Sequence, residues 1–201
     1  RICRCYSYKI MMLDKIRLKI LKSIEVKNAM LEICMNDIQD AANAMIESVS
    51  SGGKILWCGN GGSAADAQHL ATELMGGMEN HERKPIPSIS LVTDTSFLTA
   101  WSNDTGFESI FSRQIQGLGN RGDILIGIST SGNSENIIAG IKQAKYRELV
   151  TIVFTGKSGG MLEGLADISI NIPSENTQHI QEAHIMVGQI LCGLIEEHLL
   201  K

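Results

Sequence analysis

Three side chains that could take part in proton transfer follow a glycine cluster early in the chain. Asp66, His69 and Glu73 are spaced so that all three lie on one face of a helix. On their own, His69 and Glu73 form an i, i+4 polar pair, which is also typical of a solvated helix face. The glycine-rich loop directly before them favours a functional interpretation. It would place a carboxylate that can act as a base beside an anion-binding loop.

The elements around this loop are predicted from the residues on either side. An apolar run beginning at Lys54 indicates a buried strand, and a helix is expected from Ser63 to Gly76. A strand, a tight turn and a helix direct backbone N–H groups and the positive end of the helix dipole at one spot. Asn60 and Ser63 add side-chain donors there, and Ser63 is also the predicted N-cap.

A second loop, residues 126–134, repeats this arrangement after another apolar run. Gly132 allows the backbone to approach a ligand closely. Hydrogen bonds to a charged phosphate contribute roughly 1.5–3 kcal/mol each, so hydroxyls can hold a dianion without Lys or Arg. A single loop of this kind is usually an ordinary Ser/Thr-rich turn, but two loops after two strands would meet at the carboxyl edge of a parallel sheet. The hydroxyls are those of Ser129, Thr130, Ser131 and Ser134.

A dinucleotide site is the competing interpretation of the first loop. Gly59-x-Gly61-x-x-Ala64 matches the pattern G-x-G-x-x-A. The acid that would bind the ribose is expected about 20 residues further on. The candidate, Asp94, comes 30 residues after Ala64. We therefore rank a dinucleotide site below a sugar-phosphate site.

Composition limits the class of protein. The chain has 201 residues, 43% of them hydrophobic, and a net charge of −4, which is typical of one globular domain. The sequence has no Lys/Arg run that would favour nucleic-acid binding, and no apolar run long enough to predict a membrane span. Cys58 and Cys192 lie within apolar runs and indicate buried thiols in a reducing, cytoplasmic compartment.

Strands alternate with helices after a long helical start. The pattern is helical from Leu13 to about Ser50, and this amphipathic arm packs either on its own domain or in a helix bundle with other subunits. Continuously apolar strands indicate a parallel sheet covered on both faces. The fold class is therefore α/β, a single doubly wound five-stranded parallel sheet with an N-terminal helical arm. Beyond the first strand, further strands are predicted at 88–93, 123–129, 150–155 and 168–172, and helices at 107–117, 135–147, 161–165 and 177–200.

The motifs resemble those of a known family. The loop Ser-Thr-Ser-Gly-Asn-Ser (129–134) resembles the phosphate loop of sugar isomerase (SIS) domains. Cys58-Gly-Asn-Gly-Gly-Ser63 with His69 and Glu73, Asn103-Asp104, and Ile180-Gln-Glu-Ala-His184 resemble the phosphoheptose isomerases, in the same order along the chain. This resemblance implies a flavodoxin-like SIS domain over residues 12–201. Because Met11 or Met12 is the expected natural start, residues 1–11 are expected to be a non-native or disordered extension. The resemblance also implies a homotetramer with a helical core, in which neighbouring subunits complete each site.

The resemblance further implies the reaction and the residues that perform it. Sedoheptulose 7-phosphate and an aldoheptose 7-phosphate would be interconverted, an early step towards heptose in lipopolysaccharide or capsule. Zinc would be held by His69, Glu73 and Gln181, and Glu73 would be the catalytic base. The substrate-binding residues would be Asn60, Gly61, Gly62, Ser63, Asn103, Asp104, Ser129, Thr130, Ser131, Ser134 and Gln181.

One position departs from the family pattern. Eight residues after Gln181 the phosphoheptose isomerases carry a histidine that binds zinc and transfers protons, and this chain has Gln189. Glutamine cannot move a proton near neutral pH. His184 could replace that histidine only if its helix rotates, and we expect it to be buried or in an interface. A related SIS protein that binds the replication initiator also lacks this histidine, so a non-catalytic scaffold is the alternative function. That branch also lacks the equivalent of Glu73, which this chain keeps.

Overall fold

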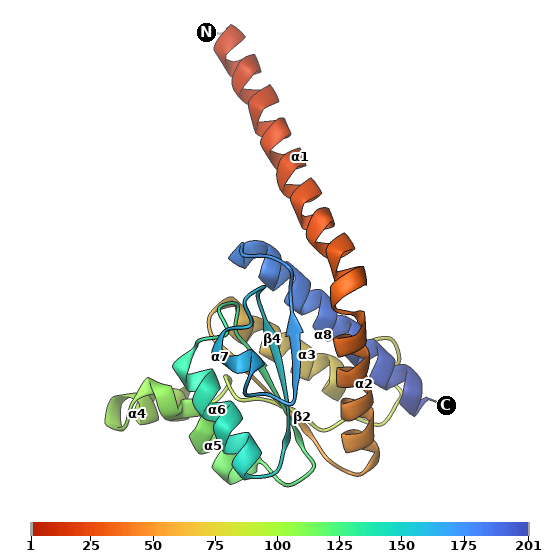
Figure 1. The fold of residues 1–201 in the computed structure, drawn as a ribbon, viewed down its shortest axis with the longest axis vertical. Helices are drawn as coiled ribbons and strands as arrows, with labels where there is room; N and C mark the ends of the chain where they lie inside the picture. Colours follow the sequence, from red (N-terminus) through yellow and green to blue (C-terminus); the bar gives the residue numbers. More distant parts are fainter. Residues whose placement is uncertain (1, 201) are drawn as a thin grey trace.

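The fold is built on one five-stranded sheet. A computed structural model describes the backbone of residues 2–200 and the side chains of residues 11–200. All strands are parallel and follow the order β2-β1-β3-β4-β5 (Figure 1). The strands are β1 (Ile55–Gly59), β2 (Ser88–Ser90), β3 (Ile124–Ile128), β4 (Val150–Thr155) and β5 (Ile168–Asn171). The predicted α/β fold is therefore confirmed.

The sheet order places the two glycine-containing loops side by side. β1 pairs with β2 on one side and with β3 on the other, so the chain reverses its direction of winding between β1 and β3. In doubly wound sheets ligands bind beyond the carboxyl ends of the strands at such a point. The loops that follow β1 and β3 begin here, because Gly59 is in register with Ile128.

Two apolar layers cover the sheet, because successive side chains of a strand point to opposite faces. On one face Ile55 and Trp57 pack with buried residues of α2, α3 and α8. On the other, Leu56 and Cys58 pack with buried residues of α5 and α6. Every β1 and β3 residue is buried, which agrees with the continuous apolar runs in the sequence.

Most helices begin and end near their predicted positions. The helical arm is divided at Cys34, whose buried side chain faces the domain. The prediction omitted α4, whose residues have mixed polarity and little burial. The helices are α1 (Ile2–Ile33), α2 (Met35–Ser50), α3 (Gly62–Gly76), α4 (Thr95–Asp104), α5 (Ile110–Leu118), α6 (Glu135–Tyr146), α7 (Gly160–Glu163) and α8 (Thr177–Leu199), with a 3₁₀ turn η1 (Phe107–Ser109).

The first helix projects away from the domain. Figure 1 shows most of α1 extending beyond the sheet and its helices, with only its last turns near α8. Large apolar side chains along it are exposed, among them Leu13, Ile16, Ile20 and Ile24. Of the helices that the structure describes, none has the length and apolar character that a membrane span requires. The expectation for residues 1–11 remains a prediction, since side chains before Met11 lie outside the described part.

Candidate active site

The first loop turns sharply between β1 and α3. Gly61 has φ 55° and ψ −118°, a conformation that a residue with a Cβ rarely adopts. Helix α3 begins at Gly62, and Gly61 occupies the N-cap position. The prediction of Ser63 as N-cap is therefore wrong: the N-cap lies two residues earlier, and Ser63 lies inside the helix and is buried. In this first turn the N–H groups of Ser63 and Ala64 donate to the carbonyls of Asn60 and Gly61 over 3.0 and 3.1 Å, so an anion would meet the start of the helix at Gly61 and Gly62.

Asn60 connects the first loop to the second strand–helix unit. Its Nδ2 donates to Oδ1 of Asn136 over 2.9 Å, and Nδ2 of Asn136 donates back to Oδ1 of Asn60 over 2.8 Å. Asn136 is 3% exposed, and its Oδ1 also accepts from the backbone N–H of Ile137. Sequence reasoning missed Asn136. The only signal was a polar side chain on the face of α6 where its neighbours are apolar.

The second loop holds its hydroxyls with internal hydrogen bonds. The Oγ atoms of Ser129 and Ser134 are 2.9 Å apart, and Oγ of Ser131 accepts from the N–H of Asn133. Ser129 is buried, Thr130 and Ser134 are partly exposed, and Ser131 is exposed. Since the Ser134 side chain bonds to Ser129 and not to the helix, it leaves donors at the start of α6 for a ligand.

Position 132 requires glycine because the backbone at Gly159 passes very close to it. The φ of Gly132 is +66°, and an added Cβ there would lie 1.9 Å from the carbonyl oxygen of Gly159. The loop is further tied down from the other side, because Asn133 Oδ1 accepts from the N–H of Met161 at the start of α7. The hydroxyls therefore project from a fixed backbone, as a phosphate-binding loop requires.

The exposed edge of α3 carries the proton-transfer candidates. His69 Nε2 lies 2.8 Å from Glu73 Oε1, and the His69 side chain is largely exposed. Asp66 is on the same side, with one buried carboxyl oxygen that has no hydrogen-bond partner. Burial raises the pKa of the Asp66 carboxyl to about 6, which nearby His69 partly opposes. The structure thus confirms that these residues share one face.

Gln181 belongs to α8, and its side chain reaches the beginning of α3, away from the other two predicted zinc ligands. A Cβ on Gly62 would be 2.6 Å from its Nε2, so its amide lies against the first turn. His69 comes seven residues later, roughly 10 Å along the helix axis at 1.5 Å per residue. Within the described residues, no group of three His, Cys, Asp or Glu side chains could hold a metal. His69 and Glu73 fit zinc as two donors, an imidazole nitrogen and a carboxylate oxygen, and further donors are needed.

His184 does not take the place of the missing histidine. It is fully buried, its Nε2–H donates to the carbonyl of Thr155 over 3.0 Å, and its ring packs against Phe154. Burial lowers the pKa of His184 to about 4, despite the hydrogen bond to Thr155. A neutral ring inside the domain cannot reach a substrate. The expectation of a buried histidine is confirmed, and Gln189 remains partly exposed on α8.

Asn103 and Asp104 lie apart from the two loops. They occupy the exposed end of α4, where Asn103 Nδ2 donates to Asp104 Oδ1. Helix α4 packs against η1 and α5 and projects from the domain in Figure 1. Within the described chain, no hydrogen bond joins these two residues to the other predicted site residues. The structure therefore does not bring these two residues together with the other predicted site residues.

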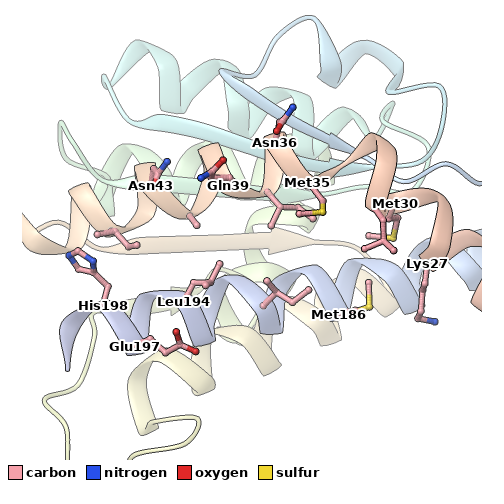
Figure 2. A pocket seen from close by; sticks show the side chains of 15 residues that line it. Lys27, Met30, Met35, Asn36, Gln39, Asn43, Met186, Leu194, Glu197 and His198 are labelled. Atoms are coloured by element: carbon pink, nitrogen blue, oxygen red, sulfur yellow. The ribbon is translucent and has the colours of Figure 1, made fainter. Parts of the chain in front are cut away.

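A groove of about 640 Å³ lies elsewhere on the molecule. Figure 2 shows it between α2 and α8, with the last turns of α1 at one end. Met30, Met35, Met186 and Leu194 make its lining mostly apolar. It contains none of the predicted site residues. The groove is therefore a surface for apolar contact and not the candidate active site.

Comparison with known proteins agrees with this geometry. The 2-1-3-4-5 sheet, with a loop after β1 and a loop after β3 at its switch point, is flavodoxin-like, and the SIS domain family model matches residues 21–156. A phosphoheptose isomerase from Aquifex aeolicus is 50% identical over 92% of this chain and 97% of its own length.

Two solved structures are similar over almost the whole chain. The phosphoheptose isomerase of Neisseria gonorrhoeae is 41% identical, with a TM-score of 0.86 over 92% of this chain and 99% of its own. That of Francisella tularensis is 40% identical, with a TM-score of 0.89 over 92% and 98%. The chain belongs to the phosphoheptose isomerase family of SIS-domain enzymes.

Proposed function

We propose that the chain is a ketose–aldose isomerase that converts sedoheptulose 7-phosphate to D-glycero-D-manno-heptose 7-phosphate. The observation that carries this proposal is the Glu73 carboxylate on α3, 2.8 Å from His69, on the helix that begins at an anion-binding loop. The comparisons support isomerase activity and give no support to a scaffold that binds the replication initiator. The product would supply heptose for lipopolysaccharide or capsule precursors, and the reaction would take place in the cytoplasm.

The residues present can account for the reaction. Ser129, Thr130, Ser131 and Ser134, with the N–H groups at the start of α6, would bind the phosphate. Glu73 would remove a proton from C1 of the ketose to give an enediolate, and a proton returned to C2 gives the aldose. The negative charge that develops on the sugar oxygens needs oriented donors, which the first loop and Gln181 would provide.

We further propose that zinc binds at His69, Glu73 and Gln181. His69 and Glu73 already converge, and rotation of the Gln181 side chain away from Gly62, or a Gln181 from another copy, would add an amide oxygen. When bound, zinc would supply Lewis-acid stabilisation of charge on the sugar oxygens. Metal analysis of the purified protein tests this independently of activity: His69→Ala should lower the zinc content of the protein, and unchanged stoichiometry would contradict the assignment.

The assembly is proposed to be a homotetramer with a helical core. Exposed apolar side chains of this number rarely remain uncovered on a stable protein, and α1 carries them along an arm that its own domain does not cover. The apolar groove between α2 and α8 continues the same surface (Figure 2). A helical core would also bring a neighbouring copy close enough to contribute residues such as Asn103 and Asp104.

A coupled isomerase assay tests the proposed function. Purified protein would be given sedoheptulose 7-phosphate with added zinc, beside a Gln189→His variant. We expect turnover by the unmodified protein and faster turnover by the variant, because histidine can move protons among the sugar oxygens and glutamine cannot. Gln178→His, near the start of the same helix, controls for simply adding an imidazole. No turnover by either protein would overturn the proposal.

A further inference from the structure

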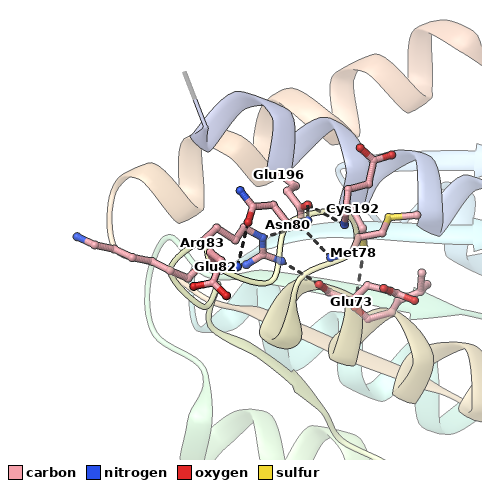
Figure 3. A network of polar contacts seen from close by, with 10 residues as sticks. Glu73, Met78, Asn80, Glu82, Arg83, Cys192 and Glu196 are labelled. Carbon is pink, nitrogen blue, oxygen red and sulfur yellow. Dashed lines mark hydrogen bonds and ion pairs between the residues drawn. The ribbon is translucent and has the colours of Figure 1, made fainter.

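A buried ion pair joins the end of α8 to the loop that follows α3. The carboxylate of Glu196 accepts hydrogen bonds from the backbone N–H groups of Met78, Glu79 and Asn80 at 2.7–2.9 Å, and from Arg83 Nε at 2.6 Å (Figure 3). The Arg83 and Glu196 side chains are 4% and 3% exposed. Three consecutive N–H groups and a guanidinium thus converge on one carboxylate.

Arg83 carries this connection into the last turn of α3. Its Nη2 donates to the carbonyl oxygen of Glu73 over 2.9 Å, and its Nη1 donates to that of Lys84. The same Glu73 carbonyl accepts from the N–H of Gly77, which ends the helix. Figure 3 shows the network running from Glu196 through Arg83 to Glu73. The backbone of the proposed base is therefore tied to α8 as well as to its own helix.

The Glu196 carboxylate is charged and accepts four hydrogen bonds. Burial alone would raise the pKa of Glu196, but the bonds from Arg83 and the three N–H groups hold it at about 2. A buried pair of this kind adds little net stability compared with an apolar replacement, so stability alone does not explain it well. Its most specific consequence is geometric, because it fixes one end of α3 relative to α8.

Fixing this end of α3 relative to α8 affects the proposed base directly, because Glu73 lies there. Glu73 lies three residues before the end of α3 at Gly76, where helices fray most easily. A displacement of the order of 1 Å in a catalytic group can lower a rate roughly 100-fold. Helix α8 carries Gln181 and Gln189 and packs closely on α3, since a Cβ on Gly188 would meet Leu70 at 2.2 Å. Fixing the two helices to each other thus fixes the base relative to the other side of the site.

We propose that Arg83 and Glu196 are positioning residues for the base Glu73, acting through its backbone carbonyl and without touching the substrate. The inference rests on the proposed isomerase function. It predicts that breaking the pair lowers kcat and leaves substrate and phosphate binding nearly unchanged, because both phosphate-site loops lie at the opposite end of α3.

The test compares Glu196→Gln with Glu82→Gln, the same substitution at an exposed residue of the same loop. We expect Glu196→Gln to lower kcat about 10-fold or more, to change KM and the Kd for inorganic phosphate less than about twofold, and to speed hydrogen exchange in the last turn of α3. Glu82→Gln should match the unmodified protein in all four measurements. A kcat per folded molecule within about twofold of the unmodified protein would overturn the proposal.

A second variant covers the case in which Glu196→Gln does not fold. Arg83→Leu combined with Glu196→Leu removes both charges, so no ion is left buried without a partner. The same fall in kcat with unchanged phosphate affinity is expected, and normal kcat would again overturn the inference. If the unmodified protein itself shows no turnover, the proposed function fails. If it turns over and both variants do so equally well, only the positioning role fails.

Discussion

Asn60, a predicted sugar-binding residue, makes a contact that only the folded chain reveals. The sequence indicated a free side-chain donor for a ligand, but the structure pairs its amide with Asn136. A periodicity argument cannot find such a pair, because the two residues are 76 positions apart and meet only when β1 and β3 are neighbours. The hydroxyls of the second loop, by contrast, were predictable, because Ser129 and Ser134 belong to one short segment.

The Asn60–Asn136 pair should hold the two loops in register. Asn136→Ala removes two hydrogen bonds and leaves the Asn60 amide without its partner, at a cost of about 2 kcal/mol of unfolding free energy. We also expect weaker binding of inorganic phosphate, measured by calorimetry, because the start of α6 is then less well fixed. Asn120→Ala, in the loop before β3, is the control. Unchanged phosphate affinity in Asn136→Ala would show that the pair does not align the loops.

At the scale of elements, the sequence predicted what periodicity and apolar runs determine. Strand β4 was predicted with the bounds it has, and α6 and α8 to within a residue at each end. Helix α4 was missed because it is short and fully buries no residue: Phe97, Leu98 and Trp101 pack only partly against the core. The packing of α8 on the sheet through His184 could not be predicted, since the partner is a backbone carbonyl on β4.

The buried His184 predicts how stability changes with pH. Its pKa is lowered from 6.5 to about 4 in the folded protein, so the stability it contributes is present above pH 6.5 and is lost as the pH falls through 4. A shift of this size corresponds to about 3 kcal/mol. Asp66, whose pKa is raised to about 6, acts in the opposite sense over part of this range.

A variant isolates the contribution of His184. His184→Gln keeps a donor for the Thr155 carbonyl and does not titrate, so its unfolding free energy should fall less steeply between pH 6.5 and 4.5 than that of the unmodified protein. Urea unfolding at several pH values measures the difference. Parallel curves for the two proteins would contradict a neutral, buried His184.

At the scale of the whole molecule, the fold class was predictable from the sequence, whereas the projection of α1 from the domain was not. Alternating apolar runs and helices predict a doubly wound sheet by themselves. The exposed stripe of α1 indicates that a partner surface is needed.

Shortening α1 tests the proposed assembly. A chain that begins at Lys22 lacks Leu13, Ile16 and Ile20 but keeps the turns that contact the domain, including Ser23, which donates to Glu182 of α8. We expect light scattering to show smaller oligomers, and turnover to be lost. The far-UV circular dichroism signal, normalised to the helical residues that remain, should be unchanged. Lys15→Ala, on the same arm, should remain tetrameric. A truncated protein that is still a tetramer with full activity would contradict the helical core.

The proton transfer assigned to Glu73 allows the most direct test of the proposed isomerase. Sedoheptulose 7-phosphate would be incubated in D₂O with the unmodified protein or with Glu73→Gln, and followed by proton NMR. We predict that the unmodified protein forms aldose with deuterium at C2, and that Glu73→Gln forms little or none, yet still binds inorganic phosphate. Equal turnover by both proteins, or no turnover by the unmodified protein under the same conditions, would contradict the account.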